Sequence, residues 1–568
     1  MVRRKLRAAV VLVAALALLA PQAAHGHAQL VGSEPERGAT LERAPSQVVF
    51  RFNERVEAAF GAVRVYDAAG NRVDDDRVAR PDGDRTVGVG LRSGLKEGTY
   101  IATFRVVSAD GHPVNGGMTF TVGAPAAVSA TVGELLERGE SGPVTEVAFG
   151  AARGLGYAAI AVAVGALAFL WLVAGRIERA RSAVAPAVRR MVLVACAVGA
   201  AATALAIVGQ GAVAGGTSYW AAFDPGVVRE VLDTRFGMAA AVRLVAWVVL
   251  AVAAARLLGG ERESRPRALI AAAFGMPAAA LVVTPGLGGH AGATSPKALM
   301  LGADIVHVAA MSVWLGGLAA MLLALPAATR RLPAAERTAV LAEAVSRFST
   351  VAIAAVVLVV AGGVAQSLKH LTAVADLRET AFGRAIAIKV LLLAGLVAIG
   401  AYNRQRLRPR LERLAAGGSP PGDAGRALRT ALRAEVLLAI GVLGVTAALT
   451  AYPPATAVTG MYSTSQPIGT LRLELTAEPL RVGPQEIHLY LLDPRTGAPW
   501  DESRDIEATL SHEGEEIGPL PVELDRAGPG HYVALSAPAP ASGSWTLRVT
   551  VRESRFDVHS SELELRIR

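Results

Sequence analysis

The chain has 568 residues, too many for one ordinary domain, and 52% of them are hydrophobic whereas 18% are charged. This composition excludes a wholly soluble protein and predicts membrane spans with soluble parts attached. The net charge of +9 comes mostly from arginines in short loops between apolar runs, so membrane topology explains it better than nucleic-acid binding. The single cysteine, Cys196, excludes an intrachain disulfide framework and a CxxC metal site.

Residues 1–26 have the pattern of a secretory signal peptide. A basic start, Arg3-Arg4-Lys5, precedes an apolar core over residues 8–20, and Ala24-His25-Gly26 offers small residues for a cleavage site. Cleavage after Gly26 makes His27 the first residue of the mature chain. The alternatives are an uncleaved anchor or a cut one or two residues away.

Residues 27–124 contain no long apolar run. Apolar and polar residues alternate in short stretches, such as Val48-Val49-Phe50-Arg51-Phe52, and turn residues separate these stretches. Alternation with this spacing predicts a small all-β sandwich. Residues 125–147 are interpreted as a linker that leads to the membrane.

Eight apolar segments follow within residues 148–452, each close to the length of about 20 residues that spans a bilayer as a helix. They predict an eight-helix transmembrane bundle, with segments at 148–174, 190–213, 237–258, 268–285, 298–325, 348–368, 383–402 and 431–452.

The loops between these segments predict the orientation. Alternate loops, 175–190, 256–267, 326–347 and 403–433, are rich in arginine, whereas the others are not. The positive-inside rule therefore places the chain in the cytoplasmic membrane with both termini on the outer, periplasmic or extracellular side. A secreted first domain requires the same orientation.

Residues 460–568 alternate again and predict a second external β-sandwich. Its role is not defined by the sequence. Its four histidines, at positions 488, 512, 531 and 559, are scattered along the chain, and we expect them on the surface.

A metal site is predicted around the new N-terminus. A free N-terminal histidine offers its α-amine and Nδ1, and a second imidazole completes a three-nitrogen set that suits Cu(II). The best source is His112, which lies two residues from Asp110 around a glycine. Asp110 would supply an oxygen ligand or orient His112. The alternative is that Asp110 and His112 belong to a purely structural turn.

The fifth apolar segment carries polar residues along one helix face. Met300, Asp304, His307, Met311 and Trp314 follow one another at intervals of three or four residues. Asp and His inside a span are costly and mark an ion path or ligand site. His290 lies just before this segment, and Lys389 is a further charge inside the seventh segment. The alternative is a polar lock between helices, formed by Asp304, His307 and Lys389.

The first domain resembles the CopC family of periplasmic copper proteins. The resemblance covers residues 27–123 and is carried by His27-Ala28-Gln29-Leu30, Ser33-Glu34-Pro35, Phe52-Asn53-Glu54-Arg55-Val56 and the stretch Ser108 to Gly116 around Asp110-Gly111-His112-Pro113-Val114. It implies a Cu(II) site of His27, Asp110 and His112, with Glu54 as a further carboxylate near the metal. Some members have a methionine-rich loop for Cu(I), whereas this domain has only Met118, so we expect Cu(II) alone.

Residues 148–452 resemble the CopD family of membrane copper proteins. The features are the eight spans, the Gly-His-Ala turn at His290, the Asp304 to His307 spacing, Trp314-Leu315-Gly316-Gly317, Arg347-Phe348-Ser349 and Lys389. The resemblance implies a CopC–CopD fusion associated with copper uptake or copper resistance. The expected function is capture of Cu(II) outside and passage of copper through the membrane, with His290, Asp304, His307, Met311 and Lys389 as pathway candidates.

Other functions remain open. A bis-histidine haem redox protein needs two facing membrane histidines, and only His307 is clearly embedded. A copper sensor or scaffold would bind the ion without moving it. An enzyme is not expected, because the site completed by Asp110 favours holding the ion. No nucleic acid is expected as a partner, and without a Walker motif direct ATP drive is not expected.

Overall fold

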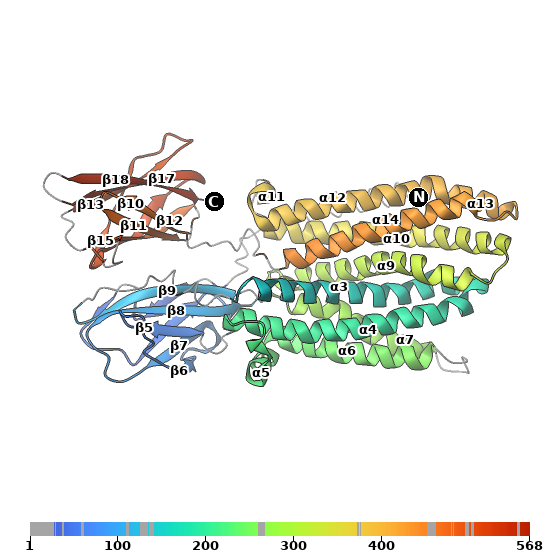
Figure 1. The fold of residues 1–568 in the computed structure, drawn as a ribbon, viewed down its shortest axis with the longest axis horizontal. Helices are drawn as coiled ribbons and strands as arrows, with labels where there is room; N and C mark the ends of the chain where they lie inside the picture. Colours follow the sequence, from blue (N-terminus) through green and yellow to red (C-terminus); the bar gives the residue numbers. More distant parts are fainter. Residues whose placement is uncertain are drawn as a thin grey trace. The chain divides into compact units, whose positions relative to one another are not determined.

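The computed structural model contains two β-sheet regions and, between them in sequence, a helical region (Figure 1). It describes residues 28, 30–36, 39–57, 62–109, 113–124, 135, 141–258, 267–371, 374, 376–450, 452, 462–478, 480, 482–494, 499–500, 505–553 and 557–567. The predicted signal peptide, residues 1–26, and the first residue after it, His27, lie outside this range.

The N-terminal domain is built from two β-sheets, with strand orders β1-β3-β7-β6 and β2-β9-β8-β4, and with β5 paired to β8. Strand β3 shows why the sequence alternates, because Phe50 and Phe52 are buried while Arg51 between them is exposed. Aromatic side chains and Met118 fill the core. The predicted all-β domain is confirmed. The strands are β1 (Leu30–Glu34), β2 (Thr40–Leu41), β3 (Gln47–Phe52), β4 (Val56–Glu57), β5 (Val63–Tyr66), β6 (Asp74–Ala79), β7 (Thr86–Leu91), β8 (Gly98–Ser108) and β9 (Pro113–Val122), with a 3₁₀ turn η1 (Gly83–Arg85).

The helical region contains eight helices long and apolar enough to span a membrane, which confirms the predicted number of spans. The spans are α3 (Pro143–Leu172), α4 (Glu178–Gly215), α6 (Arg235–Leu257), α7 (Arg267–Leu287), α9 (Lys297–Thr329), α10 (Ala334–His370), α12 (Ala381–Tyr402) and α14 (Gly422–Leu449). Shorter elements connect them: η2 (Ala174–Arg176), η3 (Ala221–Phe223), α5 (Pro225–Asp233), α8 (His290–Ala293), α11 (Asp376–Glu379), the π-helical turn η4 (Asn403–Leu407) and α13 (Arg408–Ala416). Several helices, such as α10, begin well before their apolar segment, because their first turns are polar.

Helices α3 and α9 touch through glycine. A Cβ atom on Gly165 of α3 would collide with the carbonyl oxygen of Ser312, and one on Gly316 of α9 would collide with the carbonyl oxygen of Ala161. The two backbones therefore pack directly against each other, as small residues permit in membrane helices.

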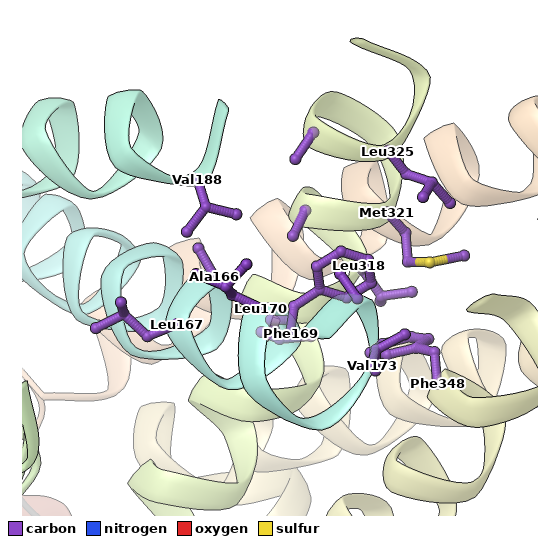
Figure 2. Packing of buried hydrophobic residues seen from close by; sticks show 14 of the residues in the cluster. Ala166, Leu167, Phe169, Leu170, Val173, Val188, Leu318, Met321, Leu325 and Phe348 are labelled. Carbon is purple, nitrogen blue, oxygen red and sulfur yellow. The ribbon is translucent and has the colours of Figure 1, made fainter. Parts of the chain in front are cut away.

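An apolar core fills the half of the bundle farther from Pro143. Figure 2 shows side chains from four helices meeting there: Leu167, Phe169 and Leu170 of α3, Val188 of α4, Leu318, Met321 and Leu325 of α9, and Phe348 of α10. Leu170 and Leu318 are almost completely buried. The core is closely packed.

Helices α6 and α12 begin in the same way. Thr234 Oγ1 accepts the Gly237 N–H at 3.0 Å, and Thr380 Oγ1 accepts the Gly383 N–H at 2.8 Å. Each cap has the pattern Thr-x-Phe-Gly, and in each helix a cation follows at the ninth residue after the threonine, Arg243 in α6 and Lys389 in α12. Because α6 is the third span and α12 the seventh, the same cap and cation recur four spans apart.

The C-terminal domain also has two sheets, with strand orders β10-β11-β12-β16-β15 and β14-β13-β17-β18. Their inner faces enclose a core of leucines, valines and the fully buried Trp545. The predicted C-terminal β region is confirmed. Its strands are β10 (Tyr462–Ile468), β11 (Leu471–Glu478), β12 (Gly483–Leu492), β13 (Asp505–His512), β14 (Leu520–Val522), β15 (Asp525–Gly528), β16 (His531–Ala539), β17 (Gly543–Arg552) and β18 (Val558–Ile567).

Candidate metal centre and membrane pathway

The predicted external copper site borders described strand ends. His27, Asp110 and His112 themselves lie outside the described residues, and their role as ligands stays a prediction. Glu54 is described: its Oε1 accepts the backbone N–H of Ala109 at 3.3 Å. Since Ala109 directly precedes Asp110, this bond fixes the Glu54 carboxylate beside the end of β8.

The chain that follows His27 is anchored at the same end of the domain. Ala28 is 2% exposed and belongs to the core. Leu30 pairs with Phe52, two residues before Glu54, and Val56 pairs with Ser108 at the end of β8. The described neighbours of all four predicted ligands therefore enter one end of the sandwich, which is the arrangement that a shared site requires.

In the membrane region, His307 is held in one orientation. Its Nδ1–H donates to the backbone carbonyl of Val359 on α10 at 2.9 Å. A carbonyl oxygen only accepts, so Nδ1 carries a proton, and in the neutral ring Nε2 then keeps its lone pair. Gly362 allows this close approach, because a Cβ there would lie 3.0 Å from the Cβ of His307. The ring is thus oriented as metal-ligating histidines usually are.

Asp304, His307 and Lys389 form one electrostatic neighbourhood. Lys389 of α12 interacts electrostatically with both Asp304 and His307 of α9. The Asp304 carboxylate lies against Gly286 of α7, where a Cβ would come within 2.5 Å of Oδ2. The structure therefore brings these three residues together.

Further polar side chains, among them Tyr157 and Arg243, belong to this neighbourhood and were missed in the sequence. Tyr157 of α3 interacts electrostatically with Asp304 and with Arg243 of α6, and Arg243 Nε–H donates to Thr284 Oγ1 of α7 at 3.0 Å. Arg243 and Lys389 follow the same cap pattern at the same spacing, and each of these cations interacts with a titratable ring, Arg243 with Tyr157 and Lys389 with His307. The sequence contains a signal for Arg243, because this residue is a charge inside an apolar segment.

These groups lie at similar depth. The four helices α3, α6, α9 and α12 are alternate spans, so all of them start at the same end of the bundle. Asp304 lies seven residues from the start of its helix, Arg243 and Lys389 lie eight and His307 lies ten, which is about 10 to 15 Å along the axis. Tyr157 lies fourteen residues from the start of α3 and is connected to them by its interactions with Asp304 and Arg243. We call Tyr157, Arg243, Asp304, His307 and Lys389 the polar layer.

The other pathway candidates are less closely connected. His290 opens the short helix α8, but its side chain lies outside what the structure describes. Met311 is half-buried and packs against the apolar core rather than in the polar layer. In the part of the chain that is described, no three or more His, Cys, Asp or Glu side chains are grouped so that they could hold a metal ion.

The expectation that the C-terminal histidines are surface residues is wrong for two of them. His488 and His531 are each 7% exposed, and His488 Nδ1 lies 3.0 Å from His531 Nε2. His488 Nε2 lies 2.9 Å from Glu486 Oε1, and the His531 ring stacks on Tyr490 at 4.2 Å. Pairing of β12 with β16 brings these residues together across 43 positions of sequence, which no local pattern predicts.

This pair predicts acid sensitivity of the C-terminal domain. Burial, together with the neighbouring His488 ring, lowers the pKa of His531 to about 3. Between the unfolded pKa near 6.5 and that value, only the unfolded chain binds the proton, so stability falls as pH falls. At about pH 5 the loss is about 2 kcal/mol. Hydrogen-exchange protection of β12 and β16 in the full chain measures it.

The variant His531→Phe keeps the stacked ring but removes the titrating group, so its protection should change much less between neutral and acidic pH. His559→Gln, on half-exposed His559 of β18, serves as the control and should behave like the wild type. An equal loss of protection in His531→Phe would show that another group is responsible.

Comparison with known proteins connects these domains with copper. Residues 30–123 match the family described as CopC domain, residues 144–298 match copper resistance protein D-like, N-terminal domain, and residues 342–449 match copper resistance protein D. Copper transport protein CutJ of Bacillus subtilis is 27% identical over 509 residues, which cover 87% of each chain. Copper resistance protein C of Pseudomonas syringae pv. tomato is 30% identical over 114 residues, 19% of this chain and 90% of that protein.

Among solved structures, CopC from Methylosinus trichosporium OB3b has 32% sequence identity and a TM-score of 0.16, with 17% of this chain and 95% of that chain covered. The fold and the matches together define a multi-pass membrane protein of the copper-handling class. The chain belongs to the CopC–CopD copper resistance family and carries both parts in one polypeptide.

Proposed function

We propose that this protein captures Cu(II) at its external N-terminal domain and passes copper across the cytoplasmic membrane through the eight-helix bundle. The ligands of the capture site are His27, Asp110 and His112, with Glu54 beside them. The polar layer accepts the ion, and His307 is its first imidazole ligand in the membrane. The protein acts as a carrier and not as an enzyme, with both termini outside.

The observation that carries this proposal is the state of His307. Its Nδ1 is engaged by the Val359 carbonyl, and its Nε2 has no hydrogen-bond partner among the described residues. An oriented, neutral imidazole inside a membrane span, next to Asp304, is costly unless it binds something. A copper ion is the ligand that fits, because imidazole and carboxylate together suit it and the family matches are to copper proteins.

The test is accumulation of radioactive copper in cells that express the full chain. His307→Ala removes the ligand and should lower transport above background by about tenfold or more, the usual scale for losing a metal contact. The control is His559→Ala, which should transport like the wild type. Both variants are compared at equal amounts in the membrane. Unchanged transport in His307→Ala would mean that the membrane pathway is wrong.

The same preparation separates the other two functions. A scaffold or sensor would bind copper in purified form while cells show no copper movement that depends on the protein. A bis-histidine haem protein would show a Soret band that disappears in His307→Ala. Transport without a Soret band supports the proposed function against both.

A further inference from the structure

Glu435 is a buried carboxyl group outside the polar layer. It lies on α14 within a membrane span and is 3% exposed. Asn403 Nδ2–H donates to its Oε2 at 3.3 Å, and a Cβ at Gly400 of α12 would lie 3.5 Å from its Oε1. A carboxylate with an amide as partner is costly inside a membrane bundle, whereas a neutral carboxylic acid is not.

Among the residues that the structure describes, no cation is paired with the Glu435 carboxyl. Of the charged residues that follow Asn403, Arg404 donates to Ser349 Oγ at 2.8 Å, Arg408 pairs with Glu412, and Arg406 is exposed. The spans packed against α14 are α3, α9 and α12. Their charged residues all lie toward the other end of the bundle: Glu146, Arg153, Lys297, Asp304, Arg384 and Lys389. Within the described residues, no charged group interacts electrostatically with Glu435.

Asn403 suits both protonation states of this carboxyl. Its Nδ2–H donates to Glu435, while its Oδ1 is buried and has no hydrogen-bond partner among the described residues. If the amide turns over, Oδ1 faces Glu435 and accepts a hydrogen bond from the O–H of the carboxylic acid. Asn403 also begins the π-helical turn η4, a local irregularity that occurs frequently at functional sites.

The position of Glu435 separates it from the polar layer. Gly400 lies eleven residues beyond Lys389 on α12, about 16 Å along the helix axis. The groups around Glu435, including Leu432 and Ala439, belong to the apolar core. A copper ion in the polar layer and a proton on Glu435 would therefore lie at different positions along the axis of the bundle.

We propose that Glu435 is a proton-binding site whose two protonation states are both hydrogen-bonded by the Asn403 amide. Protonation and deprotonation of Glu435 couple copper movement to proton movement. The coupling rests on the proposed transport function, whereas proton binding itself does not. Coupling would provide the energy source that the chain otherwise lacks, since no nucleotide-binding motif is present in the sequence.

Proton binding is tested on the purified full chain in lipid, without copper. The infrared difference spectrum between acidic and alkaline pH should contain a C=O band of a buried carboxylic acid. The band should be absent in Glu435→Gln and present in Glu343→Gln, which replaces an exposed glutamate of α10. In Asn403→Leu the band should remain but shift, because its hydrogen-bond partner is gone. A band that is missing in the wild type, or unchanged in Glu435→Gln, overturns the proposal.

Coupling is tested in vesicles with a pH difference across the membrane. For one proton per ion, the steady-state copper ratio of the wild type should change about tenfold per pH unit. Glu435→Gln should still bind copper, but its copper ratio should not respond to pH. A wild-type ratio that does not respond overturns the coupling. If the wild type moves no copper at all, the transport function fails, and the infrared result still decides whether Glu435 binds a proton.

Discussion

Replacing Gly316 by alanine should destabilise the helical bundle by about 3 kcal/mol, the upper part of the usual range for overpacking. The added Cβ would collide with the Ala161 carbonyl and approach Gly165, so both clashes are with backbone atoms. Rotamer changes cannot relieve them, and α3 must move away from α9. Equilibrium unfolding of the full chain in mixed micelles measures the loss.

Two glycines provide matched controls for this substitution. Gly156 on α3 and Gly302 on α9 have no atom within 4 Å of an added Cβ. Alanine at either position should change the free energy of unfolding by less than about 1 kcal/mol, and helix propensity favours alanine. If Gly316→Ala were as stable as these controls, the direct contact between α3 and α9 would be wrong. The separation of helices should also move Tyr157 away from Asp304 and impair copper transport.

Lengthening the mature chain by one residue before His27 should abolish the three-nitrogen Cu(II) site. The α-amine would then be one residue removed from the imidazole, and the compact chelate of amine and Nδ1 could no longer form. Electron paramagnetic resonance of the Cu(II)-loaded full chain should lose the spectrum typical of three nitrogen ligands. Mass spectrometry of the N-terminus establishes that His27 is first in the unmodified protein.

His112→Ala should weaken the same site, because it removes the third nitrogen. Glu54→Gln should leave the three-nitrogen spectrum in place, since Glu54 is tied to the Ala109 N–H and contributes at most an additional oxygen. His559→Ala again serves as the control. A mature chain that starts elsewhere, or an unchanged spectrum after the extension, would contradict the predicted ligand set.

The number and approximate limits of the spans could be predicted from the sequence. A span needs a run of apolar residues, and this requirement is local. Hydropathy alone therefore locates the eight spans. The strands were predicted for a similar reason: a half-buried strand alternates residue by residue, as Phe50, Arg51 and Phe52 do. The limits were less accurate, because polar first turns of helices such as α10 carry no hydropathy signal.

The candidate site was predicted in part. Asp304, His307 and Lys389 were recognised because an ionisable residue inside an apolar run is conspicuous. Arg243 and Glu435 carry the same signal and were passed over, and the Thr-x-Phe-Gly repeat that relates Arg243 to Lys389 is visible in the sequence. The burial of His488 and His531 could not be predicted, because it depends on the pairing of β12 with β16.

The sequence by itself therefore determined the classes of structure: two β-sheet regions, eight spans, and a histidine that a predicted cleavage places first. Each follows from periodicity or hydropathy within a short window. Only the tertiary structure decided which atoms are available for chemistry. The orientation of His307 depends on a carbonyl at Val359, and the partner of Glu435 is an amide at Asn403. These partners lie on other helices, and contact between helices is set by packing, such as the glycine contact of α3 with α9, rather than by distance along the chain.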